Sequence, residues 1–254
     1  MRNGSRFAVI LAMTGILSSV AGAGAGDSGR VALLELYTSE GCNSCPPADA
    51  WVSGLSTQLV PQKLVVLAFH VDYWNYLGWP DRFSQAHFSQ RQQAGVRYNG
   101  LRTAYTPQLL LNGRDYRQRG DIETQVARIQ AQPAHVKLSL SLVRNGAALN
   151  TKVVITPTQT SAHEPLQLYL AVYENNLHSD VQSGENRGRR LRHDYVVRSL
   201  TGPIEMAGKD LTRWDGKLIL SPEWKTEDLG LAAFVQSAKT GEILQASAKP
   251  ILAR

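Results

Sequence analysis

"VALLELYTSEGCNSCPPADAW", residues 31–51, joins a strand pattern to both cysteines of the chain and then to a helix pattern. Residues 31–37 are mostly apolar, as in a central strand that is covered on both faces. Pro46 and Pro47 suit the first turn of a helix, where backbone N–H groups have no partner within the helix. The sequence therefore predicts that Cys42 and Cys45 lie where a strand ends and a helix begins.

This position favours a redox-active cysteine pair. The N-terminus of a helix carries the positive end of the helix dipole, which stabilises a thiolate. We expect Cys42 to be the attacking sulfur and Cys45, one turn further along, to be the resolving thiol. A structural clasp and a metal site are the alternatives. A disulfide across a four-residue loop stabilises a fold by only about 2 kcal/mol, and no second cysteine pair exists to complete a four-thiolate metal site.

The first 26 residues have the pattern of a secretory signal peptide. Arg2 and Arg6 form a basic region, residues 7–20 are largely apolar, and residues 21–26 alternate alanine and glycine. The apolar run is too short to span a bilayer comfortably, and the small residues offer cleavage sites. We therefore expect a periplasmic or secreted protein without stable membrane insertion after signal removal. In such a compartment a disulfide can persist.

The charge of the chain limits the classes of partner. It has 27 basic and 21 acidic residues, and loss of the two arginines in the signal region leaves 25 basic residues. The resulting net charge of +4 is too small to indicate nucleic-acid binding. The expected partners are instead thiols or disulfides of exported proteins, and no cofactor is expected.

Residues 27–133 alternate between strand and helix patterns, which indicates an α/β domain with helices packed on a sheet. The expected strands are residues 31–37, 64–71 and 108–111. The expected helices are residues 46–59, 83–93 and 121–130, and the first and third have apolar residues at helical spacing.

Residues 134–254 follow a period of two, which indicates an all-β, sandwich-like domain. Apolar and polar residues alternate over residues 136–142 and 166–172, and Asn145-Gly146 is a hairpin signal. Further strands are expected at residues 195–197, 218–220, 231–236 and 242–248. The junction at residues 130–134 is too short to act as a flexible linker, so the second domain should dock on the first.

Four stretches resemble one known family: "LELYTSEGCNSCPPAD", "FHVDYWNYLGWPDRFS", "YTPQLLLNGR" and "GENRGRRLRHDYVVR". The chain is similar to an exported thioredoxin-like family that is catalogued as domain of unknown function 1223. The resemblance implies a thioredoxin-like fold for the first domain. It also implies a cis bond between Thr106 and Pro107, with Pro107 shaping a substrate groove beside the cysteines. Gly41 and Asn43-Ser44 depart from the usual thioredoxin residues, so the direction of exchange stays open.

The resemblance also suggests supporting residues. It places Glu35 near the buried carboxylate that accepts a proton as the resolving thiol attacks, although a salt bridge would equally explain a carboxylate in an apolar strand. Trp74 and Trp79 belong to an aromatic loop that either docks a substrate peptide or fills the seam between the domains. The most favoured function is thiol–disulfide exchange, as an oxidoreductase acting on exported proteins.

Two other functions are compatible with the sequence. Cys42, Cys45 and His70 could bind copper in an exported carrier, because thiolate and imidazole both suit that metal, and His87 is a further candidate. The chain could also be a redox-inert module that binds a partner. The arginine-rich run at residues 187–192 is typical of a solvated loop, but it could bind an anion if it folds back onto the first domain.

Overall fold

The computed structural model describes residues 1, 29–55, 57–158, 165–206 and 212–252. Apart from Met1, the predicted signal peptide lies outside these ranges. Within the described ranges, no helix is both long enough and apolar enough to cross a membrane.

The first half of the chain alternates strands with helices, much as the sequence predicts. Its elements are β1 (Ala32–Thr38), α1 (Pro46–Ser53), β2 (Leu64–His70), η1 (Asn75–Leu77), α2 (Ala86–Tyr98), β3 (Gln108–Leu111), β4 (Arg114–Asp115), η2 (Arg119–Asp121) and α3 (Ile122–Gln130). Helix α1 ends at Ser53, six residues before the predicted end. Gly54 caps the helix, because its N–H donates to the carbonyls of Ala50 and Trp51.

The second half consists of strands with one short 3-10 turn. Its elements are β5 (Val136–Asn145), β6 (Ala148–Pro157), β7 (Leu166–Glu174), β8 (Leu177–Asp180), β9 (Arg190–His193), β10 (Val196–Met206), β11 (Thr212–Ile219), η3 (Thr226–Asp228), β12 (Leu229–Ser237) and β13 (Ile243–Pro250). The predicted hairpin at Asn145-Gly146 is confirmed: β5 and β6 pair in antiparallel fashion, with Asn145 opposite Ala148 and φ of +60° at Gly146.

Strands from both halves form one eight-stranded mixed sheet, in the order β13-β12-β7-β10-β2-β1-β3-β4. Strands β1 and β2 are parallel, and β3 is antiparallel to β1. The halves meet where β10 runs parallel to β2, with Val196 opposite Ala68. The N–H of Ala68 donates to the carbonyl of Tyr195 at 2.8 Å, so a backbone hydrogen bond crosses the junction.

The predicted fold class, an α/β thioredoxin-like domain followed by an all-β sandwich-like domain, is wrong. The molecule is mostly β, and strands β7, β10, β12 and β13 of the second half extend the sheet of the first half. The reason is a strand pairing between residues 68 and 196, which are far apart in the chain. A local hydrophobic pattern indicates which residues form a strand, but it does not indicate which other strand pairs with that strand.

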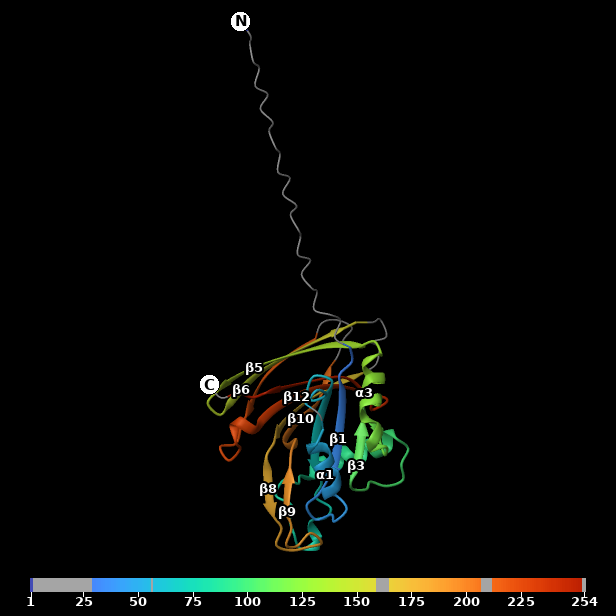
Figure 1. Ribbon diagram of the computed structural model, residues 1–254, viewed down its shortest axis with the longest axis vertical. Coiled ribbons are helices and arrows are strands. Elements are labelled where there is room, and N and C mark those ends of the chain that lie inside the picture. Colours follow the sequence, from blue (N-terminus) through green and yellow to red (C-terminus); the bar gives the residue numbers. More distant parts are fainter. Residues whose placement is uncertain (2–28, 56, 159–164, 207–211, 253–254) are drawn as a thin grey trace.

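The two faces of the large sheet are covered differently (Figure 1). Helix α2 covers one face, where its Phe88 packs with Tyr37 of β1 and Phe234 of β12. On the other face, α1 and α3 pack against β1 and β2 through residues such as Val52 and Val126. The β8–β9 hairpin lies beside α1 at the end of the molecule that carries the cysteine loop.

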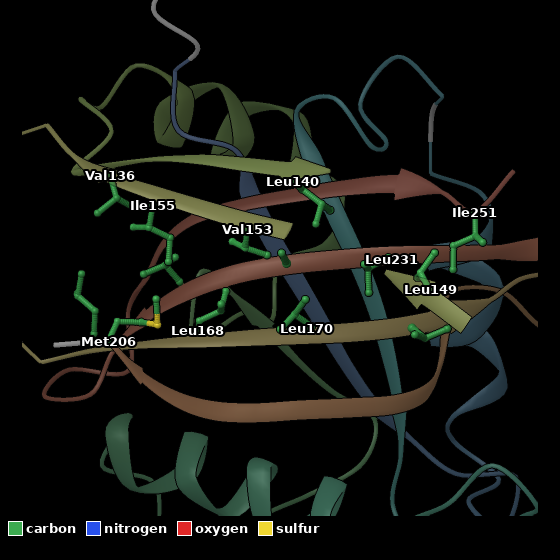
Figure 2. Close-up of a cluster of buried hydrophobic side chains, with 14 of the residues drawn as sticks. Val136, Leu140, Leu149, Val153, Ile155, Leu168, Leu170, Met206, Leu231 and Ile251 are labelled. Carbon is green, nitrogen blue, oxygen red and sulfur yellow. The ribbon is translucent and has the colours of Figure 1, made fainter. Parts of the chain in front are cut away.

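A three-stranded sheet, β11-β6-β5, packs on the remaining part of the large sheet. Figure 2 shows the side chains that fill the space between the two sheets, among them Leu140 and Val153 from one sheet and Leu168 and Leu231 from the other. The predicted alternation is confirmed in β7, because Leu166, Leu168, Leu170 and Val172 all face this core. This part of the chain has the packing of a sandwich, although one of its layers belongs to the shared sheet.

The shared sheet predicts that the two halves unfold together. Residues 27–133 alone would expose the edge of β2 that pairs with β10, and the core beneath α2 would lose the residues that the second half contributes, such as Phe234. We expect calorimetry of residues 27–254 to show one transition. We also expect residues 27–133 alone to aggregate through their uncovered apolar surface. Two separate transitions, with residues 27–133 as stable alone as in the whole chain, would contradict this expectation.

Candidate functional site

Cys42 and Cys45 form a disulfide at the start of α1, with their Cα atoms 5.4 Å apart. The carbonyl of Cys45 accepts the N–H groups of Ala48 at 2.8 Å and Asp49 at 3.1 Å, and these bonds open the helix. The hydroxyl of Ser44 lies 3.3 Å from the sulfur of Cys42. Cys42 is 1% exposed and Cys45 is fully buried, so the pair is shielded in this conformation.

The connection between β8 and β9, residues 181–189, lies against the cysteine loop, and we call it the covering loop. The side chain of Asn186 is fully buried and donates to the carbonyls of Glu40, at 2.8 Å, and Cys42, at 3.0 Å. The N–H of Asn43 donates to the carboxylate of Glu185 at 3.1 Å. These three bonds fasten the covering loop to the cysteine loop, although more than 140 residues separate them in sequence.

The structure brings the predicted aromatic residues to the segment just before Cys42. The indole N–H of Trp79 donates to the carboxylate of Glu40 at 2.7 Å. Trp74 packs so closely on Gly41 that a Cβ there would lie 3.0 Å from the Cβ of Trp74. Glycine at this position, where thioredoxins usually carry tryptophan, therefore makes room for Trp74.

Thr106 and Pro107 lie in the same region. The indole N–H of Trp74 donates to the hydroxyl of Thr106 at 2.7 Å, which links Gly41 through Trp74 to the loop before β3. The predicted cis bond between Thr106 and Pro107 is confirmed. Pro107 lines a shallow cavity of about 270 Å³ together with Tyr105, Leu109, Tyr116, Arg117 and Arg119. Both Thr106 and Pro107 are partly exposed, as residues of a surface site would be.

Glu35 is not brought to the disulfide. It lies on the face of β1 that packs against α2, since strand residues alternate between faces and its neighbours Leu33 and Tyr37 both belong to the α2-side core. Its carboxylate accepts from Nε of Arg91 at 2.6 Å and from the hydroxyl of Tyr37 at 3.2 Å. The guanidinium of Arg91 lies over the ring of Tyr169, 4.6 Å from its centroid. The structure therefore shows the salt bridge that the sequence left as an alternative.

A cluster of buried ionisable residues lies beside the cysteine loop, and the sequence did not reveal it. His193 of β9 is 2% exposed. Its Nε2 is 3.4 Å from the carboxylate of Glu40, and its Nδ1 is 3.9 Å from that of Asp49 on α1. Burial alone would lower the pKa of His193, but the two carboxylates outweigh it and raise the pKa to about 10. The sequence signal was only a histidine at the end of the arginine-rich run.

His70 and Asp81 form a second buried pair in the same cluster. Nδ1 of His70 and a carboxylate oxygen of Asp81 are 2.6 Å apart, and both side chains are fully buried. Burial would raise the pKa of Asp81, but His70 and the N–H groups of Glu40 and Phe83 hold it below its usual value. The two backbone donors lie 2.9 Å from the carboxylate. Asp81 therefore fixes the orientation of the His70 ring.

The structure groups the candidate metal ligands differently from the sequence expectation. In this oxidised form the sulfurs of Cys42 and Cys45 are bonded to each other, so neither is a thiolate that could join His70. His87 is exposed and lines the cavity next to Glu35, on the other face of the sheet. His70 instead lies with Asp49 and His193, and the three offer ligand atoms within 4.8 Å of one another.

The arginine-rich run forms part of the covering loop and strand β9, and it does fold back onto the first half. Arg189 donates to the side-chain oxygen of Asn186 at 3.1 Å, which supports the residue that fastens the loop. Arg192 is exposed and lies 3.4 Å from Asp194. The run therefore positions Asn186 and His193 at the cysteine loop.

Fold and site define a mostly β protein with a covered disulfide at the start of its first helix. The family model described as "Protein of unknown function (DUF1223)" matches residues 33–236, and the chain belongs to this family. A crystal structure of a protein from Agrobacterium tumefaciens is similar, with 27% identity and a TM-score of 0.65 over 89% of this chain and 96% of that one. HBP35 of Porphyromonas gingivalis shares the fold, with 16% identity and a TM-score of 0.68 over 89% of this chain and 76% of that one. No curated protein matches the chain.

Proposed function

We propose that the protein carries out thiol–disulfide exchange with other exported proteins through Cys42 and Cys45. The observation that carries this proposal is the setting of the disulfide. It closes a four-residue loop at the start of α1, next to a partly exposed surface that includes Trp74, Trp79 and Thr106. A purely structural disulfide of this span would stabilise the fold little. Residues 1–26, with the pattern of a signal peptide, support an oxidising compartment.

The exchange begins when a substrate thiolate attacks the sulfur of Cys42. The Cys42–Cys45 bond breaks, Cys45 leaves as a thiolate that takes up a proton from solvent, and a mixed disulfide forms on Cys42. A second substrate thiolate then attacks the substrate sulfur, and Cys42 leaves as a thiolate. Two electrons have passed from substrate to protein, and the substrate holds a new disulfide. In the reverse direction, the reduced pair opens a substrate disulfide.

The positions of the two sulfurs support different roles for them. Both sulfurs are buried in the oxidised form, Cys42 with 1% exposure and Cys45 with 0%, but Cys45 begins the helix while Cys42 lies in the loop before it. The Ser44 hydroxyl can donate to a thiolate on Cys42, which would favour its ionised form. Cys42 is therefore the sulfur that meets the substrate, and Cys45 resolves the mixed disulfide.

The substrate segment would bind beside Cys42, along Trp74, Trp79, Thr106 and Pro107. All four residues are partly exposed. Aromatic side chains of this kind anchor peptides because they bury a large apolar area while their N–H groups remain bonded. Here the N–H groups of Trp74 and Trp79 already have acceptors within the protein, so the exposed parts of both rings are free to make apolar contacts.

A direct test uses residues 27–254 in the oxidised form and a peptide with two cysteines. Mixing the two should transfer the disulfide, which mass spectrometry detects as a loss of two mass units from the peptide and a matching gain by the protein. The same peptide with both cysteines replaced by serine is the control. An unchanged peptide dithiol after prolonged incubation with the oxidised protein would refute the proposal.

The covering loop should control the rate of this exchange. Replacing Asn186 by alanine removes its bonds to the carbonyls of Glu40 and Cys42, so the loop should open more often and expose Cys42. Two lost hydrogen bonds of about 1 kcal/mol each predict reduction by an external thiol that is roughly ten-fold faster or more. The rate of reduction is measured by alkylating the released thiols in samples taken at successive times.

Arg187→Ala is the matched control for Asn186→Ala, because Arg187 is exposed in the same loop. This variant should be reduced at the unaltered rate. If Asn186→Ala were reduced no faster than the unaltered protein, the loop would not be the barrier to the disulfide.

A further inference from the structure

We propose that Asp49, His70 and His193 form a binding site for one divalent transition-metal ion, of the kind that Zn²⁺ represents. The three residues come from α1, β2 and β9, and their ligand atoms lie within 4.8 Å of one another. All three are buried. The site is separate from the sulfur chemistry, and the inference does not rest on the proposed exchange.

His70 carries the strongest part of the argument. Its Nδ1 is held by Asp81 at 2.6 Å, which leaves Nε2 as the nitrogen that faces the cluster. Nε2 is buried and has no hydrogen-bond partner within the described part of the chain. A buried nitrogen without a partner is costly. A histidine whose other nitrogen is held by a carboxylate is the usual arrangement of a metal ligand.

His193 and Asp49 complete the set. The rings of His70 and His193 are 4.9 Å apart between centroids and nearly perpendicular, at 82°. Neither ring nitrogen of His193 has a hydrogen-bond partner among the described residues. One oxygen of Asp49 accepts from the hydroxyl of Thr38 at 3.0 Å, while the other lies toward His193 at 3.9 Å. Asp49 is thus held in place with one oxygen available.

Glu40 is not one of the three ligands, but it places a second buried carboxylate beside His193. Its Oε1 is buried without a hydrogen-bond partner in the described ranges, and it lies 3.4 Å from Nε2 of His193. Its other oxygen is held by Trp79. Two imidazoles with one carboxylate are ligands that suit Zn²⁺ and neighbouring first-row divalent ions. Two carboxylates would also neutralise the charge of a divalent cation in a buried place.

A proton on His193 is the competing explanation of the cluster. A protonated ring between Glu40 and Asp49 would balance part of their charge. It would not provide a partner for Nε2 of His70, which a metal ion would. A metal ion would therefore give a partner to Nε2 of His70, which a proton on His193 leaves without one.

The site also has a route to solvent. Asp49 and His193 line a cavity of about 460 Å³ between α1 and β9, together with Pro46, Ala50, Ser53, Gly54, Arg190, Leu191 and Arg192. The cavity reaches two of the three ligands, Asp49 and His193, while His70 does not line it. An opening beside the ligands is one of the features that a metal site requires.

The test titrates residues 27–254 with Zn²⁺ in a calorimeter, after treatment with a chelator and removal of the chelator. We expect one ion per chain. His193→Gln and Asp49→Asn should abolish this saturable binding, and Asp81→Asn should weaken it about 10- to 100-fold, because Asp81 orients His70. Circular dichroism of each variant confirms that it is folded.

Two controls make the result specific. His178→Gln alters an exposed histidine in the same hairpin and should leave the affinity unchanged. The double variant Cys42→Ser/Cys45→Ser should also bind one ion, since the sulfurs are not ligands. No saturable binding by the unaltered protein would overturn the inference, and so would equal binding by folded His193→Gln. Loss of binding only in the cysteine variant would place the metal on the sulfurs instead.

Discussion

Replacing Cys45 by serine is expected to trap a covalent complex between the protein and a substrate peptide, whereas replacing Cys42 by serine abolishes exchange. Without Cys45, the thiolate of Cys42 still attacks a peptide disulfide, but no second sulfur is present to resolve the product. Mass spectrometry of the mixture should show a protein–peptide adduct for Cys45→Ser and none for Cys42→Ser. The difference should be nearly complete, because Cys42 is the sulfur proposed to attack the peptide disulfide and Cys45 is proposed only to resolve the product.

Ser44→Ala is the matched control for this trapping experiment. Ser44 is exposed between the cysteines, and its loss removes a hydroxyl near Cys42 without removing a sulfur. This variant should still complete the exchange, although more slowly. An adduct on Cys45 in the Cys42→Ser protein would reverse the assigned roles of the two sulfurs.

The second large effect concerns stability. Replacing Arg91 by methionine is expected to lower the free energy of unfolding by about 3–5 kcal/mol, because it leaves the carboxylate of Glu35 buried without its partner. The side chains of Glu35 and Arg91 are 2% and 8% exposed, so water does not replace the lost contact. Urea unfolding followed by tryptophan fluorescence measures the loss.

A double variant separates the ion pair from a proton-transfer role for Glu35. Glu35→Leu together with Arg91→Met should recover most of the stability, because no buried charge is left alone. Exchange by this double variant should proceed at the unaltered rate, since Glu35 faces α2 and not the cysteine loop. Slower exchange in a stable double variant would support Glu35 as the proton acceptor that the resemblance suggests.

The local features of the cysteine region could be predicted from sequence. Strand β1, the start of α1 at Pro46 and the cis bond before Pro107 are confirmed. The first two depend on apolar periodicity and turn chemistry within a few residues, which a sequence displays directly. The cis bond depends on the resemblance. The contact between Trp74 and Thr106 was not predicted, because it joins two loops whose relative placement the sequence does not show.

The features that could not be predicted depend on distant pairing. Val196 lies beside Ala68 because β10 joins β2, and this single pairing merges two expected domains into one sheet. The same return of the chain brings Asn186 onto Cys42 and His193 next to Asp49. Asn186 and His193 flank an arginine-rich run, so both look like solvated residues in the sequence. Their role becomes visible only when their partners are known.

The reduction potential of the Cys42–Cys45 disulfide tests the central claim most directly. The oxidised protein, residues 27–254, is equilibrated with graded dithiol–disulfide buffers, and the reduced fraction is counted by alkylation and mass spectrometry. A disulfide that exchanges with substrates should have a potential between about −270 and −120 mV, the range of proteins that exchange disulfides. The protein should remain folded on both sides of the midpoint. A potential below about −300 mV, or reduction only when the protein unfolds, would show a structural disulfide and contradict the account.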